Sequence, residues 1–99
     1  MKRTKIVCTL GPATNTEEKI KELIENGMDA ARINFSHGDY DSHTVLINAV
    51  KKVREELNAP IPLILDTKGP EIRIKKFKDN KKIYLESGSH FILTNRDVE

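Results

Sequence analysis

The sequence predicts an α/β protein built on a parallel sheet and followed by a smaller all-β segment. Up to Asp66, apolar stretches alternate with amphipathic helical patterns in the order strand, helix, strand, helix, strand. That order requires right-handed crossovers and therefore a parallel sheet. After Gly69 and Pro70, apolar residues alternate with charged ones instead. This alternation is typical of short antiparallel strands.

The first strand is predicted over residues 5–10, an apolar run that a glycine–proline pair brings to an end. A helix from about Asn15 to Asn26 follows, because its apolar residues recur at helical spacing: Ile20, Leu23 and Ile24. Thr14 and Glu17 have the spacing of a capping box at its start. The glycine after Asn26 lies where a left-handed residue commonly ends a helix.

The second strand is predicted over residues 30–34, and a polar turn over residues 36–39 leads into a longer helix. One face of this helix is apolar, through Leu46, Val50, Val53 and Leu57. Residues 58–60 end the helix, and residues 61–65 form a third apolar strand. Parallel strands need cover on both faces, so a sheet of three strands with two helices is predicted to be incomplete.

The last third of the chain is predicted to form a small β unit. Its candidate strands contain the pairs Ile72 and Ile74, and Ile83 and Leu85, and the run 91–93. Turns are predicted at residues 79–80 and 87–89. The chain therefore divides into residues 1–69, the α/β part, and residues 70–99, the start of an all-β domain.

The composition argues against several classes of function. The net charge of +2 arises from 17 basic and 15 acidic residues that are interspersed along the 99-residue chain, a pattern of solvated surfaces and not of a nucleic-acid interface. No apolar run approaches the roughly 20 residues of a membrane span, and the start lacks a signal peptide. We therefore expect a cytoplasmic protein. The single cysteine, Cys8, lies in an apolar run and is expected to be a buried, inert thiol.

The most informative residues end the second strand. Side chains alternate faces along a strand, so Arg32, Asn34 and Ser36 are predicted to point the same way, opposite to Ile33 and Phe35. The planar fork of arginine matches phosphate or carboxylate oxygens. Amide and hydroxyl oxygens are ligands for hard cations. Active sites of such sheets collect at the carboxyl ends of the strands, so an anionic substrate and a cation are expected side by side.

A second polar cluster follows the third strand. Asp66 closes an apolar run and needs either a cationic neighbour such as Arg32 or a metal ion. Thr67 offers a hydroxyl or a carbonyl oxygen beside it. Lys68 and Arg73 flank a rigid turn and are equally compatible with a second phosphate group or with solvated surface charges.

The three histidines lack the spacing of a metal site. His37 is a site candidate because it follows Ser36 in the polar turn. His43 and His90 are expected on the surface or on a helix face.

With these residues in view, the sequence resembles the amino-terminal part of the pyruvate kinase family. Three motifs carry the resemblance, which covers essentially the whole chain: residues 5–13, 27–38 and 65–73. The resemblance implies that the α/β part is the first βαβαβ portion of a TIM (β/α)8 barrel. It also implies that residues 70–99 begin a small, β-barrel-like domain inserted after the third strand.

The family transfers the phosphoryl group of phosphoenolpyruvate to ADP, giving pyruvate and ATP, with Mg²⁺ and usually K⁺ as activators, and forms homotetramers. By resemblance, Arg32 binds the substrate phosphoryl group. The resemblance also implies a K⁺ site formed by Asn34, Ser36, Asp66 and Thr67. The implied nucleotide contacts are Arg73, His37 and Asn34.

A complete barrel takes about 250 residues, so the family's catalytic lysine and acidic Mg²⁺ ligands are expected beyond this segment. The 99 residues alone are therefore predicted to be inactive. The alternative is a non-catalytic folding unit or a self-associating phosphate-binding fragment. A phosphoacceptor receiver domain is disfavoured, because it needs paired acidic residues after the first strand, where this sequence has residues 9–12 without an acid.

Overall fold

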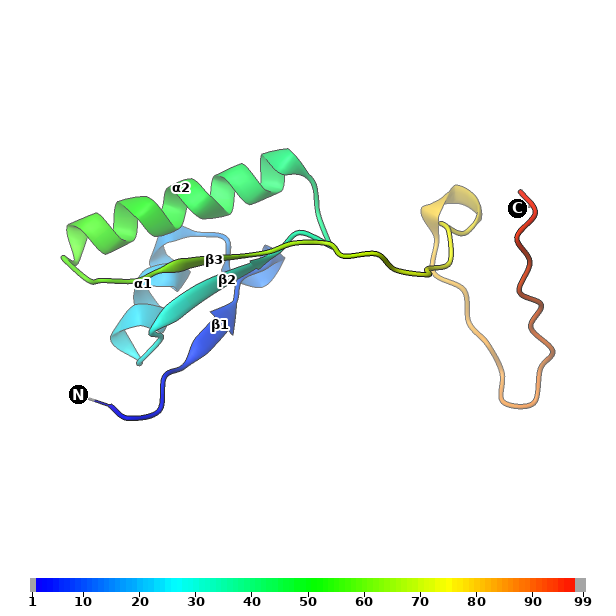
Figure 1. The fold of residues 1–99 in the computed structure, drawn as a ribbon, viewed down its shortest axis with the longest axis horizontal. Helices are drawn as coiled ribbons and strands as arrows, with labels where there is room; N and C mark the ends of the chain where they lie inside the picture. Colours follow the sequence, from blue (N-terminus) through cyan, green and yellow to red (C-terminus); the bar gives the residue numbers. More distant parts are fainter. Residues whose placement is uncertain (1, 98–99) are drawn as a thin grey trace.

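The computed structural model describes residues 2–97, so residues 1, 98 and 99 of the two predicted ranges lie outside the described part. Residues 2–67 form the expected order of strands and helices (Figure 1). These elements are β1 (Val7–Thr9), α1 (Glu17–Glu25), β2 (Ala30–Asn34), α2 (Tyr40–Glu56) and β3 (Leu63–Asp66). Two short 3-10 turns, Pro12–Thr14 and Lys78–Asn80, complete the set.

The three strands form a parallel sheet in the order β1-β2-β3, which confirms the predicted α/β class. Thr9 pairs with Arg32, and Asn34 pairs with Asp66, so the polar ends of all three strands meet at one edge of the sheet. Right-handed crossovers in this strand order place both helices on the same face. Within residues 2–97, no α-helix covers the opposite face (Figure 1).

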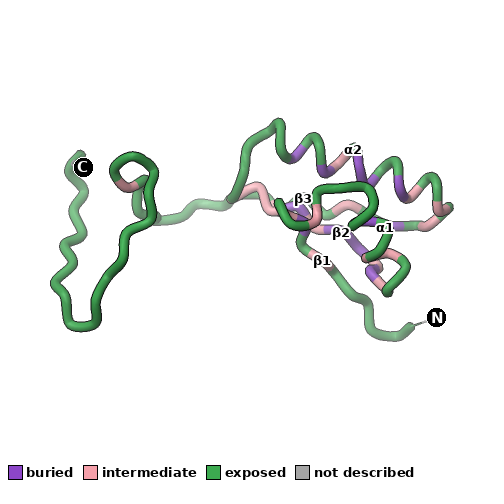
Figure 2. The backbone as a smooth tube through the Cα atoms, turned by 180° about the vertical axis from the view of Figure 1, so that it is seen from behind, coloured by how far each residue is buried: buried purple, intermediate pink, exposed green. Residues whose placement is uncertain are grey.

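The core lies between the helices and the covered face of β2. Ile20 of α1, Val50 of α2 and Ala31 of β2 are completely buried, and Figure 2 shows buried stretches along these elements. Burying a side chain of the size of Ile20 or Val50 contributes about 1.5–3 kcal/mol. This three-element contact, together with the stripe on α2 that continues through Leu46 and Val53, holds the strand ends in place.

The start of α1 differs from the prediction. Thr16 is the N-cap, and its hydroxyl accepts a hydrogen bond of 3.3 Å from the backbone N–H of Lys19. The predicted capping box of Thr14 and Glu17 is wrong, because Thr14 lies in the first 3-10 turn and its hydroxyl accepts from the N–H of Gly11 at 2.9 Å. The helix therefore begins two residues later than expected.

β3 begins at Leu63 and not at Ile61 as predicted. Pro62 has no N–H to donate, and only its carbonyl takes part in the sheet, accepting from Ala31 at 3.0 Å. Ile61 instead packs into the core at 6% exposure. The strand extends one residue further than expected, to Asp66.

The predicted antiparallel strands beyond Pro70 are wrong, because residues 70–97 contain no strand. The expected turns are present at Lys78–Asn80 and near Gly88. Apolar side chains that the prediction placed in strands, such as Ile72 and Ile92, are exposed. The radius of gyration of 18.3 Å reflects this extended segment (Figure 1), since a compact chain of this length has about 13 Å.

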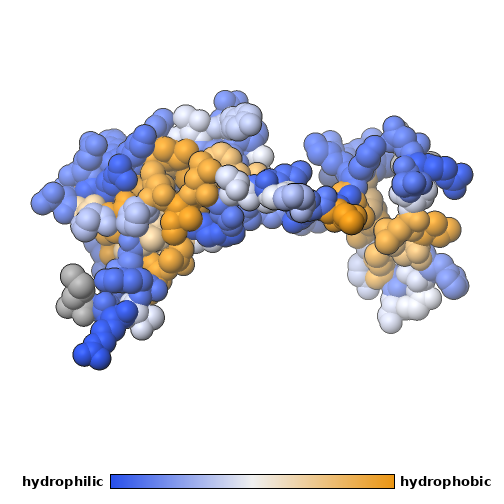
Figure 3. Space-filling view, viewed as in Figure 1, coloured by the Kyte–Doolittle hydropathy of each residue, from blue (hydrophilic) through white to orange (hydrophobic). Residues whose placement is uncertain are grey.

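Apolar side chains reach the surface over the sheet and again in the extended segment (Figure 3). On the sheet they include Val7 and Leu65, which are 51% and 57% exposed. Both belong to edge strands, which have one hydrogen-bonded neighbour each.

Within residues 2–97, no helix is long and apolar enough to cross a membrane.

Candidate functional site

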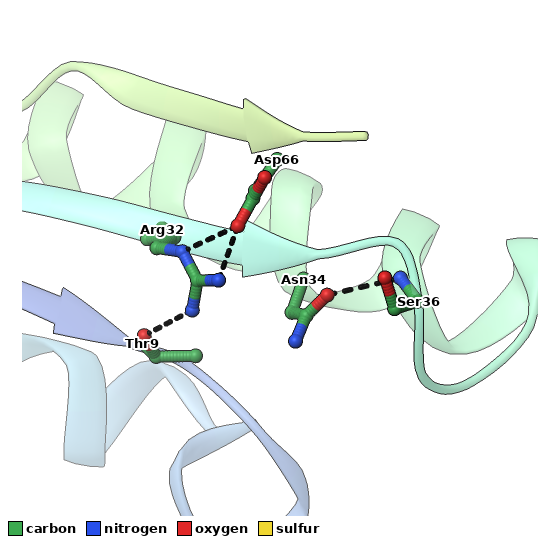
Figure 4. A network of polar contacts seen from close by, with 5 residues as sticks. All are labelled: Thr9, Arg32, Asn34, Ser36 and Asp66. Atoms are coloured by element: carbon green, nitrogen blue, oxygen red, sulfur yellow. Dashed lines mark hydrogen bonds and ion pairs between the residues drawn. The ribbon is translucent and has the colours of Figure 1, made fainter. Parts of the chain in front are cut away.

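The polar cluster lies on the helix-free face of the sheet, at the carboxyl ends of the strands (Figure 4). Ala31 and Ile33 of β2 are buried under the helices, whereas Arg32 and Asn34 are only partly buried. The predicted alternation is therefore confirmed from Ala31 to Asn34, whereas Ser36 lies in the turn beyond the end of β2. The alternation presents Arg32 and Asn34 to the open side of the sheet.

Arg32 is held from both neighbouring strands. Its Nε donates to Oδ2 of Asp66 at 2.9 Å, and its Nη2 donates to the same oxygen. Its Nη1 donates to the hydroxyl of Thr9 at 2.8 Å. These bonds use three of the five N–H groups of the guanidinium, and no group within residues 2–97 is bonded to the other two. Arg32 is therefore oriented in advance, with donors left for an anion.

Asp66 has the cationic neighbour that its position at the end of an apolar strand requires. The side chains of Arg32 and Asp66 are 32% and 44% exposed, so water screens the pair. The sequence analysis did not predict Thr9 as a member of this cluster. Thr9 is the last residue of β1 and is in register with Arg32, and its position at a strand end could have indicated its role.

The turn after β2 folds back on the strand end. Oδ1 of Asn34 accepts from the N–H of Ser36 at 2.9 Å, and the carbonyl of Asn34 accepts from the N–H of His37 at 3.3 Å. The N–H of Phe35 donates to the carbonyl of Asp66 at 2.9 Å. The segment that carries Ser36 and His37 is therefore tied to the ends of both β2 and β3.

The oxygen atoms at this edge are of the kind that bind hard cations. Asn34 supplies an amide, Asp66 a carboxylate, and Ser36 and Thr67 hydroxyl and carbonyl oxygens. Asn34 and Asp66 are register partners, so the structure brings these two together. Thr67 lines a separate pocket together with Lys68 and Tyr40.

A pocket of about 610 Å³ opens beside the cluster, between the β1–α1 turn and the start of α2. Its apolar lining includes Leu10, Pro12, Ile33, Val45 and Leu46. Its polar lining includes Asn15, Asn34, His37 and Ser42. His37 and Asn34 thus line the same cavity.

The N-terminus of α2, beside this pocket, is capped by a carboxylate of the same chain. Asp39 is the N-cap and accepts from the backbone N–H of Ser42 at 2.8 Å. This backbone bond, and next the Ser42 hydroxyl, hold the pKa of Asp39 below its usual value. The positive end of the helix is thereby neutralised within the chain.

Arg73 lies outside the cluster. Its Nε donates to Glu71 at 2.8 Å, and Lys68 pairs with the other oxygen of Glu71 at 3.4 Å. The bond from Arg73, and then the bond from Lys68, lower the pKa of Glu71 and outweigh desolvation, which raises it, so the pKa lies below its usual value. The structure therefore does not bring Arg73 or Lys68 to Arg32.

The geometry agrees with a comparison to protein families. Residues 1–98 match the family model described as pyruvate kinase, barrel domain. The chain belongs to the pyruvate kinase family. The pyruvate kinases of Staphylococcus epidermidis and Staphylococcus aureus are each 48% identical to it over 99 residues.

Solved pyruvate kinase structures share the fold. One pyruvate kinase from Cryptosporidium parvum aligns with 86% of this chain and 18% of its own chain, at 41% identity and a TM-score of 0.78. A second structure from that organism covers 69% of this chain and 14% of its own, at 42% identity and a TM-score of 0.66. This chain spans 17% of the length of the curated relatives named above.

Among the remaining candidates of this pyruvate kinase segment, His43 departs from expectation. The prediction of a helix-face position is confirmed, but the surface position is wrong, since His43 is 6% exposed. Its spacing extends the apolar stripe of α2 one step before Leu46, which was the available signal. His90 is exposed, and Cys8 is only half-buried while packing against the core.

Proposed function

We propose that this chain supplies the phosphoryl-binding arginine and the K⁺ ligands of a pyruvate kinase, which transfers the phosphoryl group of phosphoenolpyruvate to ADP. The observation that carries the proposal is the orientation of Arg32 at the carboxyl end of the central strand. Thr9 and Asp66 hold its guanidinium from both sides, and two N–H donors remain for an anion.

Phosphoryl transfer requires positioning and the stabilisation of charge on the transferring group. Arg32 meets this need with a planar fork whose orientation is set before substrate arrives. Asp66 accepts two bonds on one oxygen of its carboxylate, which fixes the fork toward β3. The role of Asp66 toward the substrate is therefore to orient Arg32.

The proposed K⁺ ligands are Asn34, Ser36, Asp66 and Thr67. Support comes from their oxygen chemistry and from the register pairing of Asn34 with Asp66. When bound, K⁺ supplies positive charge next to the phosphoryl group. Mg²⁺ is proposed to bind elsewhere in the longer protein, and within residues 2–97 no three His, Cys, Asp or Glu residues form a cluster.

The nucleotide is proposed to occupy the pocket of about 610 Å³, with Asn34 and His37 as contacts. The apolar lining near Pro12 suits a flat ring, and Asn34, at the end of the strand that carries Arg32, adds a polar group to the pocket wall. Arg73 is proposed to contact the nucleotide phosphates. That role requires residues 70–97 to move relative to their extended arrangement, which places Arg73 against Glu71.

The same proposal assigns residues 1–69 to the start of the TIM barrel domain and residues 70–99 to the start of an inserted β domain. It describes the parent protein as a cytoplasmic glycolytic enzyme that assembles as a homotetramer. The alternative, a self-associating folding unit, is favoured by one observation. Apolar side chains of both edge strands are exposed, including Val7 and Leu65.

The first test is a titration of the 99-residue chain with phosphoenolpyruvate, monitored through the NMR signal of the backbone N–H of residue 32, which Arg32→Ala retains. We expect a saturable shift that is absent in Arg32→Ala and retained in Arg96→Ala, a matched loss of one arginine in the extended segment. An unshifted signal, or equal responses in both variants, would contradict the Arg32 assignment. The mass of the chain in solution tests the alternative, because self-association predicts a dimer or larger species.

The second test asks for turnover. Because the catalytic lysine and the Mg²⁺ ligands are proposed to lie outside this segment, the chain alone is expected to make no ATP from phosphoenolpyruvate and ADP. Formation of ATP above the rate of the Arg32→Ala chain would show that residues 1–99 contain the catalytic groups. That result would refute the proposed division of roles.

A further inference from the structure

We propose that His43 is a positioning residue, whose ring supports the segment 34–38 that carries Asn34, Ser36 and His37. The ligand roles of those three residues rest on the proposed function. The support itself does not, because it follows from contacts within the chain. No substrate, metal or nucleotide role is assigned to His43.

The first observation is the position of the His43 ring. His43 is in the first turn of α2 and is 6% exposed. Within residues 2–97, it is the one polar or charged residue that is buried. It lines both the pocket beside Asn34 and the smaller pocket beside Thr67. The imidazole therefore forms part of the wall between two cavities at the strand ends.

The second observation is a ring contact. The rings of His43 and Phe35 are stacked, with centroids 4.3 Å apart and an interplanar angle of 20°. Phe35 is also tied to β3 through its N–H, which donates to the carbonyl of Asp66 at 2.9 Å. His43 therefore fixes the residue that immediately precedes Ser36.

The third observation is a backbone contact on the other side of the segment. Gly38 has a φ of +77°, and a Cβ placed there would lie 3.3 Å from Cε1 and 3.5 Å from Nε2 of His43. It would also lie 2.9 Å from the hydroxyl oxygen of Ser42. The backbone at Gly38 thus lies close to the imidazole, and a side chain at this position would be strained and would require Ser42 and His43 to shift.

These contacts lie on both sides of the turn that carries Ser36 and His37. His43 touches Phe35 before Ser36 and His37, and approaches Gly38 after them. Nδ1 of His43 has no hydrogen-bond partner within residues 2–97 although it is buried. Burying an unpaired polar atom opposes folding, so hydrogen bonding by Nδ1 does not explain the residue. The flat ring, which fits between Phe35 and Gly38, does.

The test compares variants of the full 99-residue chain by amide hydrogen exchange. The N–H groups of Ser36 and His37 are the reporters, because both are hydrogen-bonded to Asn34. In His43→Leu, which keeps an apolar side chain but loses the stack, we expect exchange at the two reporters to accelerate about tenfold more than at α1 amides. In His43→Phe, which restores a flat ring, we expect the excess to fall substantially.

Leu46→Ala is the matched control, because Leu46 is buried one turn further along α2 and lines the same pocket. It is expected to accelerate exchange at reporters and α1 amides alike. The proposal is refuted if His43→Leu also accelerates all amides equally, or if Leu46→Ala reproduces the local excess. Should His43→Leu fail to fold, Gly38→Ala provides the local perturbation, and the absence of an excess there is equally contradictory.

This experiment separates the inference from the proposed function. The exchange rates are measured without ligand, so they stand even if phosphoenolpyruvate does not bind. Both proposals expect two results together. Phosphoenolpyruvate shifts the Arg32 signal identically in wild type and in His43→Phe, and His43→Leu shows faster hydrogen exchange at the two reporter amides than at the α1 amides. Loss of the ligand shift alone contradicts only the role of Arg32.

Discussion

β2 and the candidate strands of residues 70–97 both alternate apolar with polar or charged side chains, yet only residues 2–67 form a layered structure. In β2, Ile33 is 2% exposed because helices cover that face of the sheet. In the second region, Ile74 is 61% exposed and no element covers it. Alternation selects which side chains share a face, but a strand also needs a hydrogen-bonded neighbour and a covering layer.

Polar contacts differ between the regions in the same way. Arg32 and Asp66 are 34 residues apart in sequence and join two strands. Arg73 and Glu71 are two residues apart and lie within one segment. Contacts of the first kind are lost when the chain unfolds, whereas contacts of the second kind can persist in an unfolded chain. The stability of the molecule therefore resides in residues 2–67.

The largest expected effect is on the core. Ile20→Ala removes a completely buried side chain between the helices and the sheet, and is expected to lower the free energy of unfolding by about 2–4 kcal/mol. Ile72→Ala, the same substitution at a fully exposed position of the extended segment, is expected to change it by less than about 0.5 kcal/mol. Urea denaturation followed by circular dichroism measures both. Equal losses would show that residues 70–97 share the core.

A smaller effect is expected for the ion pair at the strand ends. A double-mutant cycle of Arg32→Ala and Asp66→Ala is expected to give a coupling of about 0.5–1 kcal/mol, since both side chains are partly exposed and screened by water. The same cycle with Arg73→Ala and Glu71→Ala is expected to show no coupling in unfolding. A coupling at the second pair as large as at the first would mean that it, too, links distant elements.

The pH dependence of stability distinguishes the regions further. The bond from Lys2, and next the backbone N–H of Ile6, lower the pKa of Asp29. A carboxylate whose pKa is lower in the folded state stabilises above its unfolded pKa, and loses that contribution as pH falls through the folded value. Below about pH 4, the wild-type chain is therefore expected to lose stability more steeply than Asp29→Asn.

The matched control for this titration is Glu71→Gln. The pKa of Glu71 is also lowered, but its partners Arg73 and Lys68 lie in the same short segment. We expect the acid limb of the stability curve to be unchanged in this variant, as measured by urea denaturation between neutral and acidic pH. If the loss of stability in acid were less steep in Glu71→Gln than in Asp29→Asn, the extended segment would contribute more to the acid sensitivity of folding than residues 2–67.

The smallest effect is expected for removal of the extended segment. A chain that ends at Gly69 keeps the three strands, both helices and the ion pair of Arg32 with Asp66. Its free energy of unfolding is expected to equal that of the whole chain within about 0.5 kcal/mol. Thermal and urea unfolding would reveal a larger loss, and such a loss would mean that residues 70–97 stabilise the sheet.

Local patterns in the sequence were sufficient for much of the first region. The bounds of β2 were predicted correctly as 30–34, and the apolar stripe of α2 identified Leu46, Val50 and Val53 as core residues. Gly27 ends α1 with a φ of +111°, as its position suggested. These features follow from side-chain periodicity and backbone sterics, which act over a few residues and are readable in sequence.

The remaining features depended on which elements meet in space. The pairing of Arg32 with Asp66 was foreseen as one of two possibilities, but the contribution of Thr9 required the register of β1 against β2. The burial of His43 depended on the position of the turn at Gly38 above it. Residues 70–97 form no strand because no other element covers them. In each case the deciding contact joins elements whose relative placement a local pattern does not encode.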